Sequence, residues 1–412
     1  MKTVLKNAGV LTMKNQEILN GFDILFDEGK IIRIAPGLET SGVNTIDCTG
    51  KYIIPGLFDM HVHINSSDMM PLFFANGVTS VRSMWGFPLQ LEWKKKAEHG
   101  ELLSPYIYTT GPLTDGAEYW KGCLVVKTPD EAEKAVHSVL ETDGYIFFKT
   151  YPSIPKDAYL HLLAVAKKHN LKVVGHGSSE LSWKTLADFG YYCCEHTRCL
   201  PDDESDLIYV AKSGMWMCPT HCVFNAGLEY LWEGKSFSEY KYKEYLPESE
   251  YKRWESITEW RKTNGRIDLT KPNPNSLEKI IAKGRKFIEI AGVDKIILGT
   301  DTPNPGVIAG FTIFEELCYM VDFYKLSNFE AIKAGTVNAA LNLGIEKQKG
   351  MLSEGYDADM LIINGNPLDD IKNVSLLDTV IQGGRIYNRA ALDAILENAR
   401  NIKDDDVVSI YS

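Results

Sequence analysis

The sequence predicts an α/β protein, a (β/α)8 TIM barrel with a small β-sandwich domain formed from both termini. Three observations support this prediction. The middle of the chain alternates apolar, strand-like runs with helical patterns, as parallel barrels do. Both ends contain strand-like runs separated by turns. The length of 412 residues accommodates a barrel of about 250 residues and a smaller appendage.

Eight candidate strands define the predicted barrel, which occupies residues 56–347. The strands are expected at 57–64, 78–84, 105–111, 144–151, 171–177, 191–197, 215–221 and 295–301. Helical patterns between them include 129–140, 155–169 and 178–189. The first two open with a proline, which suits the first turn of a helix.

The terminal segments 1–55 and 348–412 are expected to form the composite β-sandwich domain. Alternating apolar residues flank Glu28-Gly29-Lys30, and this pattern predicts a hairpin. Strand-like runs at 358–364 and 379–387 are the counterparts near the other end.

Residues 225–276 interrupt the alternation of strands and helices, and they are rich in Tyr, Trp, Lys and Glu. Long insertions in compact domains are usually functional, so this segment is predicted to be a lid or substrate loop. A solvated helical excursion that only supports the fold is the alternative.

Composition excludes several classes of protein. The formal net charge of −11 argues against a nucleic-acid partner. No apolar run reaches the roughly 18 residues of a membrane span, and the first residues lack the apolar core of a signal peptide. We therefore expect a cytoplasmic protein that acts on a small molecule, with a homo-oligomer left open. The 8 cysteines are predicted to be reduced and mostly buried.

His61 and His63 are the most informative residues of the chain. Successive side chains of a strand point to opposite faces, so histidines two positions apart share a face and can bind one ion. A pair of buried, hydrogen-bonded histidines is the alternative. Barrel active sites lie at the carboxyl ends of the strands, so polar residues at the other strand ends distinguish the two interpretations.

Six groups that can bind or influence a metal fall at predicted strand ends: His61, His63, Lys149, His176, His196 and Asp301. Taken singly, four of them have structural alternatives. Lys149 could be a solvated lysine and His176 a core histidine. His196 could be paired with Glu195, and Asp301 could be a helix cap. Together they favour a catalytic zinc-type ion that keeps one position open for water. Arg82, at the end of the second strand, is predicted to form a structural salt bridge.

The sequence resembles the amidohydrolase superfamily over essentially its full length. The similarity is to the binuclear branch related to prolidases (Xaa-Pro dipeptidases), other metal-dependent dipeptidases and imidazolonepropionase-like proteins. The matching elements are Pro55-Gly56-Leu57-Phe58-Asp59-Met60-His61-Val62-His63, Gly77-Val78-Thr79-Ser80-Val81-Arg82, Lys149 followed by Tyr151, Gly175-His176, Glu195-His196, Gly299-Thr300-Asp301 and the segment 355–368.

The resemblance implies two divalent metal ions, with zinc as the expected metal. His61, His63 and Asp301 would bind one ion and His176 and His196 the other, and Lys149 would bridge them in its N-carboxylated form. The implied reaction is hydrolysis of a C–N amide bond in a dipeptide, Xaa-Pro or N-acyl amino acid substrate. A metal-bridging hydroxide would be the nucleophile, and Asp301 the general base and then the general acid.

Tyr151, Arg198 and His221 complete the predicted site. Tyr151 lies two residues beyond Lys149 on the same strand and could donate a hydrogen bond to the developing oxyanion. Arg198 and His221 are candidates for binding a substrate carboxylate or carbonyl. The alternative for Tyr151 is a tyrosine packed in the barrel, and the alternative for Arg198 and His221 is a structural ion pair or a cap.

Two departures from the family pattern bear on the substrate. Some single-metal deaminases carry a glutamate three residues after the fifth-strand histidine, where this chain has Ser179, with Glu180 one position late. This spacing disfavours a deaminase. Prolidase-like members carry a histidine in a glycine segment after the third strand, whereas residues 111–120 contain none. Xaa-Pro specificity therefore stays open. A cyclic amide or lactone hydrolase with the same metals and a metal-free, non-catalytic binding protein are the alternatives.

Overall fold

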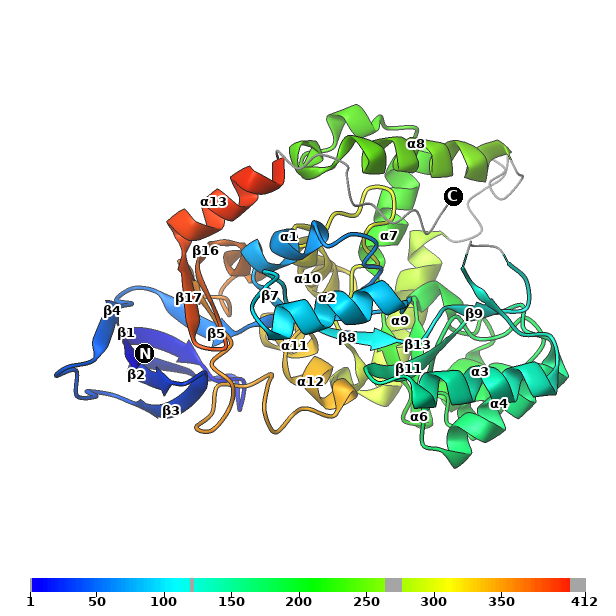
Figure 1. Cartoon of the computed structure of the whole chain (residues 1–412), viewed down its shortest axis with the longest axis horizontal. Helices are drawn as coiled ribbons and strands as arrows, with labels where there is room; N and C mark the ends of the chain where they lie inside the picture. Colours follow the sequence, from blue (N-terminus) through cyan, green and yellow to red (C-terminus); the bar gives the residue numbers. More distant parts are fainter. Residues whose placement is uncertain (1, 119–121, 264–275, 401–412) are drawn as a thin grey trace.

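Seven parallel strands form a nearly closed barrel surrounded by helices in the computed structural model, which describes residues 2–118, 122–263 and 276–400 (Figure 1). Neighbouring strands follow the order β14-β13-β12-β11-β8-β7-β6. Their bounds are β6 (Leu57–Val62), β7 (Val78–Ser83), β8 (Tyr106–Thr110), β11 (Tyr145–Thr150), β12 (Lys172–Gly175), β13 (Cys193–Glu195) and β14 (Trp216–Cys218). The short strands β9 (Thr114–Asp115) and β10 (Leu124–Val125) extend the sheet at β11. The predicted α/β barrel is confirmed.

The eighth predicted strand, 295–301, is not a continuous strand. Ile296 within it and Thr302 directly after it form isolated parallel bridges instead, to Met217 of β14 and to Val62 of β6. Asp301 donates its backbone N–H to the carbonyl of His61 at 2.7 Å. The ladder is irregular because Asp301 has a φ of 64°, which no extended strand permits. The segment nevertheless connects the two edges of the sheet.

Helices alternate with the barrel strands as predicted. They are α1 (Met69–Ala75), α2 (Pro88–Glu98), α3 (Pro129–Glu141), α4 (Lys156–Lys168), α5 (Trp183–Asp188), α6 (Glu204–Lys212), α9 (Leu277–Ala291), α10 (Thr312–Asp322), α11 (Asn328–Ala334) and α12 (Val337–Leu343). Helix α5 is shorter than the predicted 178–189 because Ser182 caps its N-terminus by accepting a hydrogen bond from Thr185 N–H.

Both ends of the chain contribute to a second, mostly antiparallel sheet, in the order β17-β16-β15-β5-β1-β2-β3, with β4 also paired to β1. The strands are β1 (Thr3–Leu11), β2 (Ile18–Asp27), β3 (Lys30–Ala35), β4 (Asn44–Asp47), β5 (Tyr52–Pro55), β15 (Met360–Ile363), β16 (Leu377–Gln382) and β17 (Arg385–Asn388). The predicted hairpin is confirmed, since Asp27 pairs with Lys30. The domain boundaries at 55 and 348 stay predictions.

The insertion after β14 is mainly helical and packs through aromatic rings. It contains α7 (His221–Ala226), the π-helix η2 (Gly227–Trp232), the short helices η3 (Phe237–Glu239) and η4 (Lys243–Tyr245), and α8 (Glu248–Thr263). The rings of Tyr242 and Tyr245 stack on Phe311 of the barrel at 4.5 and 4.6 Å. Figure 1 shows α8 at the top of the molecule, near the end of the C-terminal helix α13 (Arg389–Arg400). Residues 264–275 of the predicted lid lie outside the described residues, and its role stays a prediction.

All 8 cysteines are free thiols, and six of them are buried, as predicted. None of the described helices combines the length and the apolar composition that crossing a membrane requires.

Gly299 allows the barrel to close, and substituting it is expected to destabilise the protein. A Cβ there would lie 2.5 Å from Cys218 Sγ and 2.8 Å from the backbone nitrogen of His61. Gly299→Ala should therefore lower the free energy of unfolding by about 1–3 kcal/mol, measured by chemical denaturation. Gly227→Ala is the matched control, since nothing lies within 4 Å of its Cβ position. Equal stability of the two variants would contradict the close approach.

Candidate metal centre

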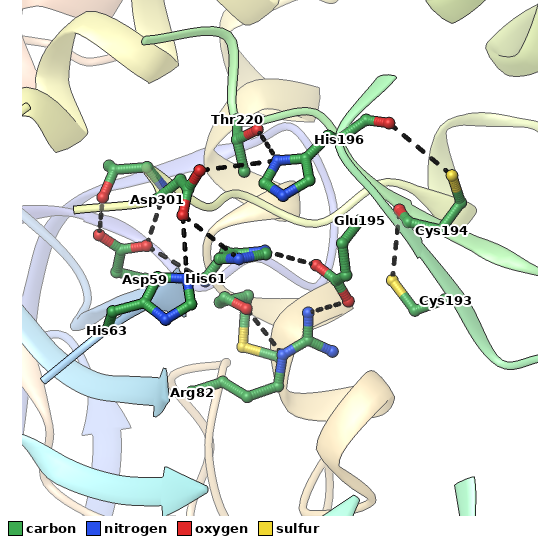
Figure 2. A network of polar contacts seen from close by, with 12 residues as sticks. Asp59, His61, His63, Arg82, Cys193, Cys194, Glu195, His196, Thr220 and Asp301 are labelled. Atoms are coloured by element: carbon green, nitrogen blue, oxygen red, sulfur yellow. Dashed lines mark hydrogen bonds and ion pairs between the residues drawn. The ribbon is translucent and has the colours of Figure 1, made fainter. Parts of the chain in front are cut away.

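Three of the predicted ligands meet at one end of the barrel. His61 lies on β6, His63 directly follows that strand, and Asp301 belongs to the closing segment. Their ligand atoms lie within 4.8 Å of one another. Asp301 Oδ1 is 3.4 Å from His61 Nε2 and 3.1 Å from His63 Nε2. Figure 2 shows the three side chains pointing towards one another.

The remaining predicted ligands lie beside this group. His176 follows β12 and His196 follows β13, and their ring centroids are 4.5 Å apart. The ring of His196 is also 4.7 Å from that of His61. Lys149, on β11, is fully buried and close enough for its charge to influence the pKa of His61, His176 and His196. The structure thus brings all six predicted side chains together.

Several polar atoms of this cluster have no hydrogen-bond partner among the described residues, although they are buried. They are His61 Nε2, His63 Nδ1, Lys149 Nζ, His176 Nδ1 and Asp301 Oδ1. Unsatisfied polar atoms in a protein interior are costly and therefore rare. Metal coordination would satisfy imidazole nitrogens and a carboxylate oxygen, so this donor set fits divalent ions of the zinc type.

The electrostatics favour the protonation states that metal ligands need. Burial lowers the pKa of His61 to about 4, and the charge of Lys149 adds to the effect. Burial likewise holds the pKa of His176 and His196 well below the usual value. Burial raises the pKa of Asp301, but its interactions with His196 and His61 and the hydrogen bond from His63 outweigh the burial and keep that pKa well below its usual range. Neutral imidazoles and an ionised carboxylate result.

A buried ion pair behind the site orients His61. Glu195 accepts a hydrogen bond from Arg82 Nη2 at 2.7 Å with one oxygen, and its other oxygen lies 2.8 Å from His61 Nδ1. Because Arg82 keeps Glu195 ionised, His61 Nδ1 must carry the hydrogen, which leaves Nε2 free as a ligand. The predicted salt bridge of Arg82 is confirmed. The alternative pairing of His196 with Glu195 is wrong, since His196 Nδ1 contacts Thr220 Oγ1 at 2.7 Å.

Glu195 also belongs to a second group that could hold a metal, with His61 and Cys218. Both Glu195 oxygens are already engaged by Arg82 and His61. Burial raises the pKa of the Cys218 thiol well above its ordinary value, so a thiolate there is unfavourable. The group of His61, His63 and Asp301 is therefore the better metal site.

Asp59 and Thr220 are site residues that sequence reasoning missed. Asp59 Oδ2 accepts a hydrogen bond from Thr300 Oγ1 at 2.6 Å, and Asp59 Oδ1 accepts one from Thr300 N–H at 2.9 Å. These bonds join β6 to the closing segment directly before Asp301. The period of two that relates His61 to His63 also includes Asp59, and this was the available signal. Thr220 has no comparable pattern in the sequence.

Three residues of the site have unusual backbone conformations. His196, Thr220 and Asp301 have φ values of 72°, 52° and 64°. A non-glycine residue in this region costs of order 1–3 kcal/mol, and such residues cluster at functional sites. Gly175, before His176, shows a related constraint, because a Cβ there would lie 2.0 Å from the carbonyl oxygen of Thr150.

The predicted substrate-binding residues lie at different distances from the cluster. The ring of Tyr151 is 4.0 Å from that of His176. Arg198 is exposed at the rim, with its guanidinium 5.9 Å from the ring of Phe224. His221 is buried among aromatic rings, and its Nδ1 lies 3.1 Å from Tyr324 Oη. Phe224 contacts the rings of both His196 and His221, so His221 is one ring removed from the metal ligands.

Known proteins resemble the chain in sequence and in fold. Ochratoxinase of Aspergillus niger is 38% identical over 115 residues, 27% of this chain and 23% of that protein. An adenine deaminase of Clostridium perfringens is 40% identical over 88 residues, 20% of this chain and 15% of that protein. The matches thus span less than a quarter of these relatives. A crystal structure of a Xaa-Pro dipeptidase with bound methionine has a TM-score of 0.73 at 22% identity and covers 94% of this chain and 100% of its own, which shows a shared fold.

The model of the amidohydrolase family matches residues 52–387, a range that contains the whole barrel and all six clustered side chains. A match of this extent shows that the chain belongs to the amidohydrolase family.

Proposed function

We propose that the protein is a binuclear metal-dependent hydrolase that cleaves a C–N amide bond of the dipeptide, Xaa-Pro or N-acyl amino acid type. One observation supports this most: four imidazoles, one carboxylate and one buried amine meet at one barrel end, and five of their buried polar atoms have no hydrogen-bond partner among the described residues. His61, His63 and Asp301 would hold one ion, and His176 and His196 the other. When bound, two divalent ions, expected to be zinc, polarise the scissile carbonyl and lower the pKa of a water molecule.

Lys149 is proposed to act as an N-carboxylated ligand between the two ions. Its amine must be neutral to react with CO2, and burial lowers the pKa of Lys149. The reaction forms an N–C bond and releases one proton, and the resulting carbamate supplies two oxygen ligands where a lysine supplies none. The missing hydrogen-bond partner of Nζ, among the described residues, supports this role.

Asp301 is proposed to transfer the proton of the reaction. Its pKa lies well below the usual range, so the carboxylate is ionised at neutral pH and can accept a proton from the attacking water. The same oxygen can then return that proton to the departing nitrogen. Tyr151, whose ring lies 4.0 Å from that of His176, is proposed to donate a hydrogen bond to the developing oxyanion.

Arg198 and His221 are proposed to recognise the substrate. The exposed guanidinium of Arg198 can pair with the carboxylate that dipeptides and N-acyl amino acids share. His221 Nε2 has no hydrogen-bond partner in the described part of the chain and can bind a carbonyl or carboxylate. The cytoplasmic location stays a prediction.

Deamination is the less favoured activity, despite the similarity to an adenine deaminase. Ser179, at the position of the deaminase glutamate, donates its hydroxyl to the carbonyl of Pro152 at 2.8 Å. Glu180 is exposed and accepts from the backbone N–H of Lys156 at 2.8 Å, at the start of α4. Neither side chain acts as the expected deaminase glutamate in this arrangement.

A substrate panel tests the proposed function. Metal-loaded protein should hydrolyse N-acyl amino acids or dipeptides, with adenine as the deaminase control. Turnover confined to cyclic amides or lactones would establish the alternative chemistry of the same metal centre. Protein that binds no metal and turns over none of these substrates would favour the alternative of a metal-free binding protein.

Substituting Asp301 should abolish hydrolysis because proton transfer and one metal ligand are lost together. We expect Asp301→Asn to lower kcat/KM by at least about 10²-fold, the lower limit for losing a general base. Asp393→Asn, on exposed α13, is the control. A variant of Asp301 that retains most activity would refute its assignment.

Carboxylation of Lys149 can be measured directly. Protein equilibrated with ¹³C-bicarbonate should give a carbamate carbon signal in the NMR spectrum that Lys149→Ala lacks and Lys172→Ala retains. Lys149→Ala should also bind fewer than two metals per chain, and acetate should partly restore activity by replacing the carbamate oxygens. Two tightly bound metals in Lys149→Ala would exclude the bridging role.

A further inference from the structure

Helix α8 buries polar side chains, although it is a mainly polar helix. Its buried residues are Glu250, Trp254 and Thr258, which follow one another at intervals of four and therefore share one face. Glu250 is only 6% exposed. A carboxylate buried to this extent needs polar partners, so its contacts indicate what the helix is built to hold.

Glu250, Arg253 and Trp254, here called the α8 cluster, contact two loops of the barrel. Glu250 Oε1 accepts a hydrogen bond from Asn65 Nδ2 at 3.0 Å, and its Oε2 accepts one from Arg253 Nε at 2.8 Å. Arg253 Nη2 and Trp254 Nε1 both donate to the carbonyl oxygen of Pro303, Trp254 at 3.1 Å.

Both contacted residues lie two positions beyond a proposed metal ligand. Asn65, which is 1% exposed, follows His63, and Pro303 follows Asp301. The α8 cluster therefore joins the two backbone segments whose side chains would share one ion. These segments come from opposite ends of the barrel sequence, and the cluster connects them from outside the sheet.

The Asp301 segment needs such support because its backbone is strained. Asp301 has a φ of 64°, a conformation that persists only where the surroundings determine it. Its carbonyl accepts hydrogen bonds from the backbone N–H and the Nδ2 of Asn304, the latter at 2.8 Å. Pro303 lies within this turn, so the two donors from α8 hold the turn on its other side.

The helix itself is anchored firmly. Trp254 is fully buried, and its ring lies 5.4 Å from those of both Phe237 and Tyr240. Tyr230 stacks on Phe237 at 4.5 Å. These aromatic contacts fix α8 to the rest of the insertion, so its donors have defined positions.

We infer that Glu250, Arg253 and Trp254 are positioning residues of the metal centre, which keep His63 and Asp301 at the spacing that one shared ion requires. The inference rests on the proposed function. Its consequence is that the insertion acts on metal retention. None of the three residues needs to touch the metal or the substrate.

Metal release tests this inference with a readout other than activity. Zinc-loaded wild type and Arg253→Met are mixed with excess chelator well below the unfolding temperature, and zinc loss is followed with time. We expect Arg253→Met to release zinc about tenfold faster, because loss of outer-shell support costs about 10- to 100-fold in metal affinity. Lys252→Met is the matched control, since Lys252 is 69% exposed and pairs with the equally exposed Glu248 on the same helix. It should release zinc at the wild-type rate.

Two further variants separate positioning from general destabilisation. Arg253→Lys should be intermediate, because an ammonium can pair with Glu250 but lacks the guanidinium fork that also reaches Pro303. Asn65→Ala and Glu250→Ala should each speed zinc loss, and the double variant should be no faster than Glu250→Ala, because that substitution already removes the hydrogen bond to Asn65 as well as the ion pair with Arg253. This cycle decides the question if Arg253→Met does not fold.

The outcomes distinguish the inference from the proposed function. Wild-type zinc release by Arg253→Met, or additive effects in the cycle, would overturn the inference and leave the proposed function standing. Wild-type protein that binds no zinc would overturn both. Faster release by Arg253→Met together with an unchanged control would support the inference.

Discussion

The buried ion pair between Arg82 and Glu195 is the interaction on which the metal centre depends. Arg82 lies on β7 and Glu195 on β13, so the pair joins strands that are not neighbours in the sheet. Removing either partner would leave an uncompensated buried charge, which is strongly destabilising. The pair keeps Glu195 ionised, and ionised Glu195 fixes the hydrogen of His61 on Nδ1. The protonation state of a proposed ligand on β6 thus follows from a charge on the neighbouring strand β7, which acts through Glu195 of β13.

The same end of the barrel combines this rigid pair with strained backbone. His196 and Asp301 reach the cluster through positive φ angles, and Gly175 and Gly299 provide the close approach that their neighbours need. Regular strands would direct these side chains differently. Hydrogen bonds from Thr300 to Asp59 and from α8 to Pro303 hold the irregular segment on both sides of Asp301. The site therefore depends on irregular backbone conformations that the surrounding contacts stabilise.

Much of this arrangement could be predicted from the sequence, because local patterns carry it. The spacing of His61 and His63, the strand-helix alternation and the hairpin at Glu28-Gly29-Lys30 are all short-range signals. The eighth strand could not be predicted correctly, since a positive φ at Asp301 leaves no trace in hydrophobic periodicity. The contact between Glu195 and His61 could not be predicted either, because the two residues are 134 positions apart in the sequence. The same holds for Asn65 and Glu250, which are 185 positions apart.

The sheet shared by both chain ends has a consequence for the order of assembly during synthesis. Strand β5 ends at Pro55, with only Gly56 between it and β6, and it pairs with β15, with Ile54 opposite Leu361. The strand that carries His61 is thus anchored to a sheet whose other half is synthesised after all the barrel strands. Contacts of such long sequence separation form late in folding. The nascent barrel consequently lacks a finished metal centre until β15 has been synthesised, and ion capture follows that step.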